Sequence, residues 1–212
     1  MRFESRSMRP IARRVCRRCA AIAAALVVAA TPACNEGQGP EGLGSMTAFV
    51  VDDSPGAAPQ TTSGALGHSG ALTGSASIAI FSEATGWVSL GSPSAVNLAM
   101  QSSEQGQIAT AVQVPLGTYT RVRFELTSAQ ALITAGSDLG GGPLVADVPV
   151  GVGGGDLSVT VEKTIAPVTV QAFTSWTVRV DMNSDLWIDE AAVAAQSVTD
   201  AAIESATTLT LM

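Results

Sequence analysis

Val112-Gln-Val-Pro-Leu-Gly-Thr-Tyr-Thr-Arg-Val-Arg-Phe-Glu-Leu126 is the stretch that decides the fold of this chain. The chain enters it through a turn marked by a proline and a glycine, and beyond the turn its residues alternate in polarity. One face carries Thr120, Val122, Phe124 and Leu126, and the other carries Tyr119, Arg121, Arg123 and Glu125. A period of two with one apolar face predicts a half-buried β-strand, and such strands bury their apolar faces by packing sheet against sheet.

The rest of the chain repeats this pattern in short segments separated by glycine-rich turns. Strands are expected at 46–51, 77–81, 87–90, 107–114, 129–134, 144–150, 157–162, 168–170, 174–182 and 207–211, with a strand or a turn of helix at 95–100. Residues 60–74 are expected to form a loop, and the alanine-rich stretch 189–205 a short helix. Many short strands with little helix predict an all-β fold, an antiparallel β-sandwich over residues 45–212.

The first 33 residues have the composition of a secretory signal peptide. Seven arginines in residues 1–18 face one acidic residue, and the apolar run 20–30 ends in small residues. The run is much shorter than the ~20 apolar residues that cross a bilayer. We therefore expect export and cleavage, with an uncut N-terminal anchor helix as the alternative. Residues 34–44, rich in glycine, are expected to form a flexible tether.

Cys34 is expected to be acylated. Thr31-Pro-Ala-Cys34 resembles the lipobox of bacterial lipoproteins: Ala33 and Cys34 fit the pattern, while Thr31 and Pro32 depart from it. Cys34 is the last cysteine of the chain, so the exported part has no partner for an internal disulfide. Asn35, which is not the aspartate that retains such proteins in the inner membrane, favours an outer-membrane location in the cell envelope.

The charge of the exported part excludes several partners. From Cys34 onward the chain has four basic residues against 17 acidic ones, a net charge of −13. This charge argues against binding to nucleic acids and against attraction to anionic lipid surfaces. The predicted membrane contact is the lipid on Cys34.

Three segments resemble a known bacterial family. Gly86-Trp-Val-Ser-Leu90, Gly117-Thr-Tyr-Thr-Arg-Val-Arg123 and Val180-Asp-Met-Asn183 resemble strands of domain of unknown function 4382, whereas Asn97-Leu-Ala-Met100 departs from the corresponding motif. The resemblance covers about residues 45–211. It implies a lipid-anchored envelope protein with a transthyretin-like or immunoglobulin-like sandwich, and it brings no catalytic residue.

Nucleophilic catalysis finds little support in the sequence. His68, in Gly67-His-Ser-Gly-Ala71, half-resembles the G-x-S-x-G elbow of esterases. That elbow requires a strand before it, a helix after it and a separate histidine, but His68 is the only histidine of the chain. After removal of the signal peptide, Cys34 is the only cysteine that could act as a thiol nucleophile. The exported part also lacks the cysteine and histidine ligands of a usual zinc site.

A calcium site is the best remaining metal hypothesis. Its candidate ligands are Asp181, Asn183, Asp185 and Asp189, whose spacing resembles the oxygen ligands of a calcium loop. Leu186 and Ala192 stand where that loop normally has glycine and glutamate. The alternative is a strand end followed by Asx-type turn residues.

Three arginines and three tryptophans complete the candidate residues. Arg121, Arg123 and Arg179 form either an anion or partner site or cross-strand pairs with acids such as Glu125 and Asp181. Trp176 lies on the apolar face of its strand and is expected in the core. Trp87 and Trp187, near turns, are expected at the surface as a sugar-stacking site.

These observations favour a non-enzymatic function. The leading hypothesis is a lipid-anchored envelope protein that serves adhesion, binding or assembly, with an envelope protein or a glycan as partner. A carbohydrate- or calcium-binding accessory module is the first alternative, and a hydrolase that uses only carboxylates is the second.

Overall fold

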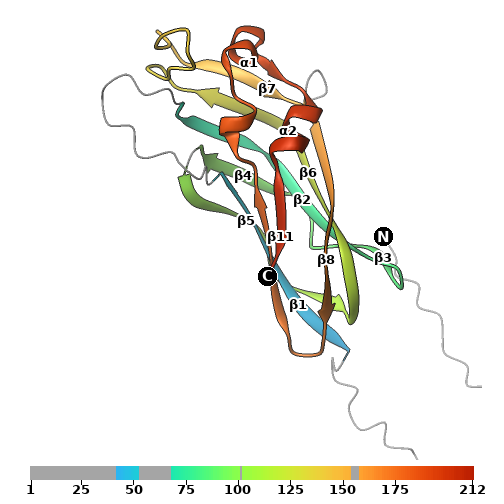
Figure 1. The fold of residues 1–212 in the computed structure, drawn as a ribbon. Helices are drawn as coiled ribbons and strands as arrows, with labels where there is room; N and C mark the ends of the chain where they lie inside the picture. The colour runs from blue at the N-terminus through green and yellow to red at the C-terminus, as the bar shows by residue number, and fades with distance from the viewer. Residues whose placement is uncertain (1–41, 53–67, 101, 154–157) are drawn as a thin grey trace, which may run out of the picture. The chain divides into compact units, whose positions relative to one another are not determined.

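Two β-sheets pack face to face in the part of the chain that the computed structural model describes, residues 42–52, 68–100, 102–153 and 158–212 (Figure 1). The first sheet has the order β11-β9-β1-β5. Its strands are β1 (Leu43–Asp52), β5 (Ser102–Pro115), β9 (Ser175–Asp181) and β11 (Thr208–Leu211). The predicted β-sandwich is confirmed, and its first strand begins inside the segment assigned to the tether.

The second sheet is built around two long strands, β2 (Gly70–Ser82) and β6 (Gly117–Ile133), which pair antiparallel along most of their length. On its outer side β2 pairs first with β4 (Ser94–Ala99) and then with β3 (Gly86–Ser89). On the other side β6 pairs with β8 (Ser158–Val170) and then with β7 (Val148–Val152), whose neighbour is β10 (Ser197–Val198). The expected hairpin of residues 77–81 and 87–90 is confirmed.

Both sheets are mixed, which differs from the antiparallel arrangement expected from the sequence. β1 and β9 run parallel, with Ser45 opposite Ser175 and Val51 opposite Asp181. β10 and β7 are the second parallel pair. Parallel neighbours need a long crossover connection. The alternation of polar and apolar residues along these strands does not indicate which of them are joined in this way.

β6 confirms the predicted alternation over most of its length. Val122, Phe124 and Leu126 are fully buried, while Arg121 and Arg123 on the opposite face are partly exposed. The strand expected at 129–134 is also confirmed, as the continuation of β6. Ser128 has a φ of 52°, and the pairing with β2 shifts register there, so the strand bends without ending.

Tyr119 corrects the predicted face of β6. It was expected beside the arginines, but it is fully buried, and its hydroxyl donates a 2.8 Å hydrogen bond to the carbonyl oxygen of Pro115. The pairing of β6 with β8 shifts register between Tyr119 and Arg121, which moves the tyrosine to the inner face. Because the chain passes from the first sheet to the second at Leu116, this bond closes the corner between the two sheets.

Two other predicted segments have different bounds. β2 begins at Gly70, so residues 70–74 belong to a strand and not to the expected loop, whose residues 60–67 lie outside the described part. The strand expected at 144–150 is β7, which begins at Val148 and ends at Val152.

The alanine-rich stretch forms two short helices, α1 (Glu190–Ala195) and α2 (Asp200–Ala206), on either side of β10. Each begins at a side-chain cap, since Asp189 accepts from the amide of Ala192 and Thr199 from that of Ala202. None of the helices among the described residues has the length and apolar character needed to cross a bilayer.

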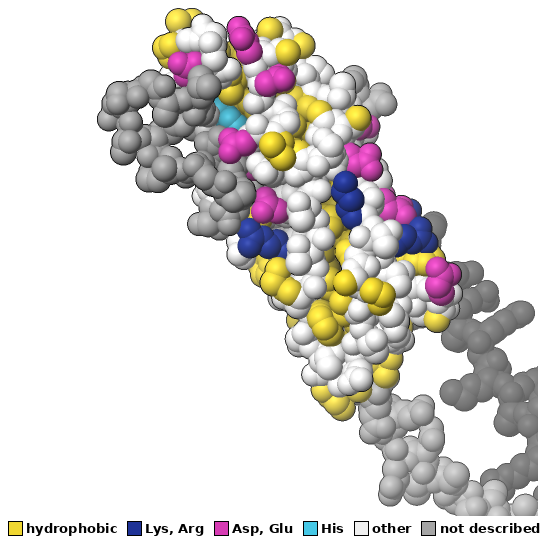
Figure 2. All heavy atoms as spheres, in the orientation of Figure 1, with side chains coloured by type: hydrophobic (Ala, Val, Ile, Leu, Met, Phe, Trp, Pro, Cys, Tyr) yellow, Lys and Arg dark blue, Asp and Glu magenta, His cyan; other side chains and the backbone are white. Residues whose placement is uncertain are grey.

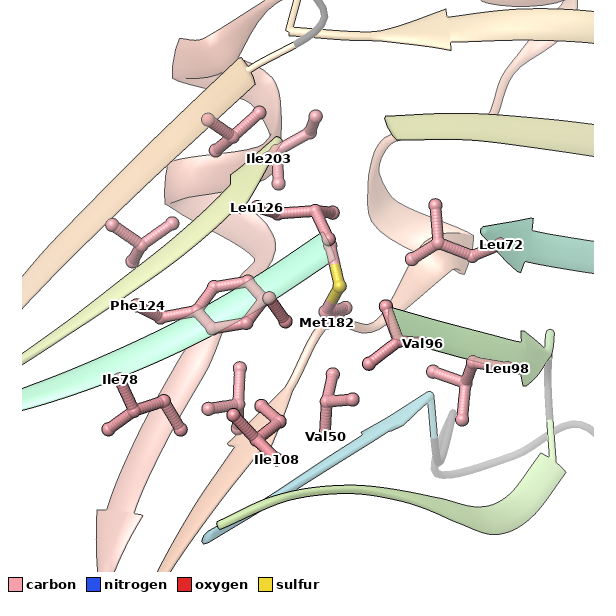
Figure 3. Close-up of a cluster of buried hydrophobic side chains, with 14 of the residues drawn as sticks. Val50, Leu72, Ile78, Val96, Leu98, Ile108, Phe124, Leu126, Met182 and Ile203 are labelled. Carbon is pink, nitrogen blue, oxygen red and sulfur yellow. The ribbon is translucent and has the colours of Figure 1, made fainter. Parts of the chain in front are cut away.

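The core lies between the two sheets and is closed at one end by the segment after β9. Figure 3 shows Val50 and Ile108 of the first sheet facing Ile78 and Phe124 of the second. Other core side chains in this view are Leu72, Val96, Leu98, Leu126, Met182 and Ile203. Burial of these side chains, at about 1.5–3 kcal/mol each, stabilises the sandwich.

Candidate functional site: a buried Asp–Ser–His cluster

Three buried polar side chains meet at the end of the sandwich where β1 and β9 both end. Asp52 is the last residue of β1, His68 precedes β2, and Ser184 opens the short 3-10 helix η1 (Ser184–Leu186). Their exposed fractions are 1%, 3% and 0%. Buried polar groups are costly unless they are hydrogen-bonded, so the contacts among them define what this cluster does.

The parallel pairing of β1 with β9 brings Asp52 to Ser184. The two strands end side by side, and the amide of Met182 donates to the carbonyl oxygen of Val51. Asn183 then turns the chain with a φ of 39°. As a result, the amide of Ser184 donates a 2.6 Å hydrogen bond to Asp52 Oδ1, and the Ser184 hydroxyl donates to Asp52 Oδ2.

His68 is held on the other side of the serine. Its Nε2 lies 2.9 Å from Ser184 Oγ. Because the hydroxyl proton of Ser184 is given to Asp52, the serine oxygen can only accept from the imidazole, and Nε2 must carry a proton. The neighbouring Ser69 is fixed as well, since its amide donates to Ser137 Oγ at 3.1 Å.

Burial and charge act in opposite directions on His68. Desolvation, the larger effect, lowers the pKa of His68, whereas Asp185 and then Asp52 raise it. Nδ1 of the ring lies 3.8 Å from Asp185 Oδ1. With a pKa below its ordinary value, His68 is neutral at pH 7, with its proton on Nε2.

The order Asp185, His68, Ser184 matches a catalytic triad, but the direction of its hydrogen bonds is the opposite. In a triad the histidine accepts the serine proton and so activates the oxygen. Here the serine donates to Asp52 and accepts from His68, and its side chain has no contact with solvent. The cluster ties the ends of β1, β9 and the start of β2 together, and we assign it a structural role.

The four predicted calcium ligands lie at the end of β9 and in the segment between it and α1. Asp189 Oδ1 caps α1 through a 2.7 Å bond from the amide of Ala192, and Asp181 Oδ2 lies 3.5 Å from Arg179 Nη2. Asn183 forms the turn before η1, and Asp185 faces His68. Within the described ranges, the structure groups no three His, Cys, Asp or Glu side chains in a way that suits a metal ion. Calcium binding stays a prediction.

Trp187 is not at the surface, contrary to the expectation. It is 3% exposed, and its indole Nε1 donates a 2.8 Å bond to the carbonyl oxygen of Met182. η1 turns the chain back at once, which places the indole over the core. Trp176 packs against the core as expected, but its Nε1 is buried without a hydrogen-bond partner.

Trp87 is partly exposed and belongs to a ladder of stacked side chains on the outer face of the second sheet. Its ring lies 5.3 Å from that of Phe81, its partner across β2 and β3. The guanidinium of Arg123 lies 4.0 Å from the Trp87 ring centroid, and that of Arg121 lies 3.7 Å from the Phe81 ring centroid. Of the two predicted stacking residues, only Trp87 remains accessible.

The two arginines of this ladder pair with an acid that the sequence did not suggest. Arg121 Nη1 and Arg123 Nη2 lie 2.9 Å and 3.0 Å from the Glu162 oxygens, so β8 supplies the partner and not Glu125. The hydrogen bond from Arg123, followed by that from Arg121, lowers the pKa of Glu162. Cross-strand pairing is therefore confirmed for these two arginines, whereas Arg179 pairs with Asp181 along the same strand and not across strands as expected.

Sequence reasoning missed Ser184 and Glu162, and it did not place Asp52 in a buried cluster. The residues after β9 carried a signal, because their polar side chains are typical of oxygen ligands. Cys34, the predicted acylation site, lies outside the described residues. No family model matches the chain, and neither a curated protein nor a solved structure matches it.

Proposed function

We propose that this chain is an exported, lipid-anchored β-sandwich of the bacterial cell envelope with a non-enzymatic role in binding, adhesion or assembly. The observation that carries the proposal is the position of the first strand. β1 begins at Leu43, nine residues after Cys34. A flexible segment of that length spans about 16 Å as a random coil, so a lipid on Cys34 would hold the sandwich next to the membrane. The resemblance to domain of unknown function 4382 favours the same role.

The arrangement of the buried cluster argues against a serine-hydrolase role. A serine hydrolase needs an exposed nucleophile that gives its proton to histidine. Ser184 is buried and gives its proton to Asp52. The carboxylate hydrolase considered above remains a separate hypothesis, and loss of a measured hydrolase activity in Asp185→Asn is the result that would favour it.

Expression of the wild type and of Cys34→Ala in a bacterial host tests the anchor. Acylation predicts incorporation of a radiolabelled fatty acid by the wild type, membrane sedimentation that detergent reverses, and loss of both in the variant. Cross-linking in intact cells then captures the partner. A membrane-bound Cys34→Ala protein without label would refute the proposal, because a different segment would then hold the chain.

A glycan-binding role is the alternative that a specific observation favours. Trp87 presents a partly exposed ring whose position is fixed by Phe81 and Arg123, and sugars stack on such rings. Titration with envelope polysaccharides while following tryptophan fluorescence tests it, with Trp87→Ala as the variant that must lose the response. A rise in melting temperature with millimolar calcium, reversed by a chelator, would favour the calcium module.

A further inference from the structure

The end of the sandwich where β1 begins carries apolar side chains that the fold leaves in solvent. Leu43 pairs with Pro115, Gly117 pairs with Val170, and the amide of Ser45 donates to the carbonyl oxygen of Thr174. Three separate segments therefore adjoin at this end. We call the surface formed by Leu43, Leu116 and Phe173 the apolar tip.

Phe173 is the most prominent residue of the apolar tip. It is 84% exposed, and it lies in the turn between β8 and β9 with a φ of 63°. The turn is held by Thr174, whose amide and hydroxyl both donate to the carbonyl oxygen of Gln171. Glycine is the residue that normally occupies such a left-handed position. A large apolar side chain held there, facing solvent, is a strained arrangement of the kind found at functional sites.

The surroundings of the apolar tip are uncharged. Five strand segments run from the tip without a charged side chain, namely 43–51 of β1, 105–115 of β5, 117–120 of β6, 164–170 of β8 and 175–178 of β9. The first charged residues beyond them are Asp52, Glu104, Arg121, Lys163 and Arg179. Leu116 is 39% exposed beside them, and a hollow of about 240 Å³ lies between Leu43 and Phe173. Glu83, in the neighbouring β2–β3 turn, is the acidic residue at the edge of this region.

The distribution of charge separates the two ends of the described unit. Figure 1 places the turn between β8 and β9 and the start of β1 at the end opposite α1 and α2. On the face drawn in Figure 2, Asp and Glu side chains lie mostly over the half that carries the helices, whereas hydrophobic side chains occur over both halves. An acidic protein that approaches a bilayer with its uncharged end avoids repulsion by anionic lipids.

We infer that the apolar tip contacts the lipid bilayer, with Phe173 inserted at the boundary between headgroups and acyl chains. This inference rests on the proposed anchor at Cys34. Leu43, which is itself part of the tip, follows Cys34 by nine positions, so the chain enters the sandwich at the end that carries Phe173. The short tether raises the local concentration of the tip at the membrane, so that a few apolar side chains suffice for contact.

The test places a fluorescent reporter on the tip and another on a remote exposed loop. Phe173→Trp is compared with Val145→Trp, because Val145 is 100% exposed and lies before β7. The chain from Cys34 onward, which contains all described elements and one cysteine, is coupled through that thiol to a maleimide lipid in phosphatidylethanolamine–phosphatidylcholine vesicles. Spectra of the parent protein are subtracted to remove the native tryptophans.

We expect the indole at position 173 to shift to shorter wavelength and to be quenched by lipids brominated about 5–10 Å below the interface. The indole at position 145 should keep its wavelength and escape quenching. Equal solvent exposure at the two positions would overturn the inference. So would a blue shift at position 173 that appears without vesicles and grows with protein concentration, because it would assign the tip to a second copy of the chain.

Chemical coupling separates this inference from the proposed function. If cells leave Cys34 unmodified, the proposed anchor fails, while the coupled protein still reports on the tip. If the protein from cells is acylated but position 173 stays in water, only the tip inference fails.

Discussion

Replacing Ser184 by alanine removes the hydroxyl that joins Asp52 to His68. The charge-assisted bond from Ser184 Oγ to Asp52 is lost, at about 1.5–3 kcal/mol. The Nε2 proton of His68 loses its acceptor in a buried site, which costs about 1–3 kcal/mol more. The amide of Ser184 still donates to Asp52 Oδ1. We therefore expect Ser184→Ala to lower the free energy of unfolding by about 3 kcal/mol.

Urea unfolding followed by tryptophan fluorescence measures this loss, because Trp187 is buried next to η1 and becomes exposed on unfolding. The midpoint should fall while the slope stays unchanged. Ser205→Ala is the matched control: its exposed hydroxyl bonds only the carbonyl oxygen of Ala202 within α2, so its effect should stay within about 0.5 kcal/mol. A loss below about 1 kcal/mol in Ser184→Ala would refute the hydrogen-bond directions assigned to the cluster.

Three further predictions concern pH, the sheet corner and the stacked ladder. Since burial holds the pKa of His68 below its ordinary value, the unfolded chain binds more protons, and stability should fall as pH drops below about 6.5, by at most about 1.4 kcal/mol per pH unit; His68→Gln should flatten this dependence in unfolding curves at pH 5–7. Tyr119→Phe should cost about 1 kcal/mol, because it removes the bond to Pro115 and leaves the ring in place, and an unchanged urea midpoint would contradict the corner role. Glu162→Gln should cost at most about 1 kcal/mol at low salt and nearly nothing at 1 M NaCl, whereas a loss that salt does not reduce would show that the pairs with the arginines are not what stabilises the ladder.

Strand alternation predicted those parts of the fold in which a strand keeps its period. In β9 the expected inner face is confirmed, since Val178 and Val180 are buried. The period fails at Tyr119, where the pairing with β8 shifts register. Such a shift depends on the partner strand, so the residues around Tyr119 carry no sign of it. The polar threonines and the arginine that flank the tyrosine made the outer face the natural expectation.

The buried cluster was hidden for a related reason. Asp52 and Ser184 are 132 positions apart and meet only because β1 and β9 are parallel neighbours. A sequence shows that both segments are strands, but not which strands pair or in which direction. In the sequence His68 stands next to Ser69, whereas its hydrogen-bond partner, Ser184, lies 116 positions further along the chain.

The residues around Trp187 predict an exposed side chain, but the side chain is buried. Acidic and amide residues precede it, and a tryptophan in such a segment is expected at the surface. The same residues instead form the tight turn of η1, in which Asn183 adopts a left-handed conformation and Ser184 bonds to Asp52. The turn brings the indole over the core, where its proton meets the carbonyl oxygen of Met182. The polar residues that suggested exposure are therefore what buries the tryptophan, and loosening this turn by Ser184→Ala should also increase the exposure of Trp187.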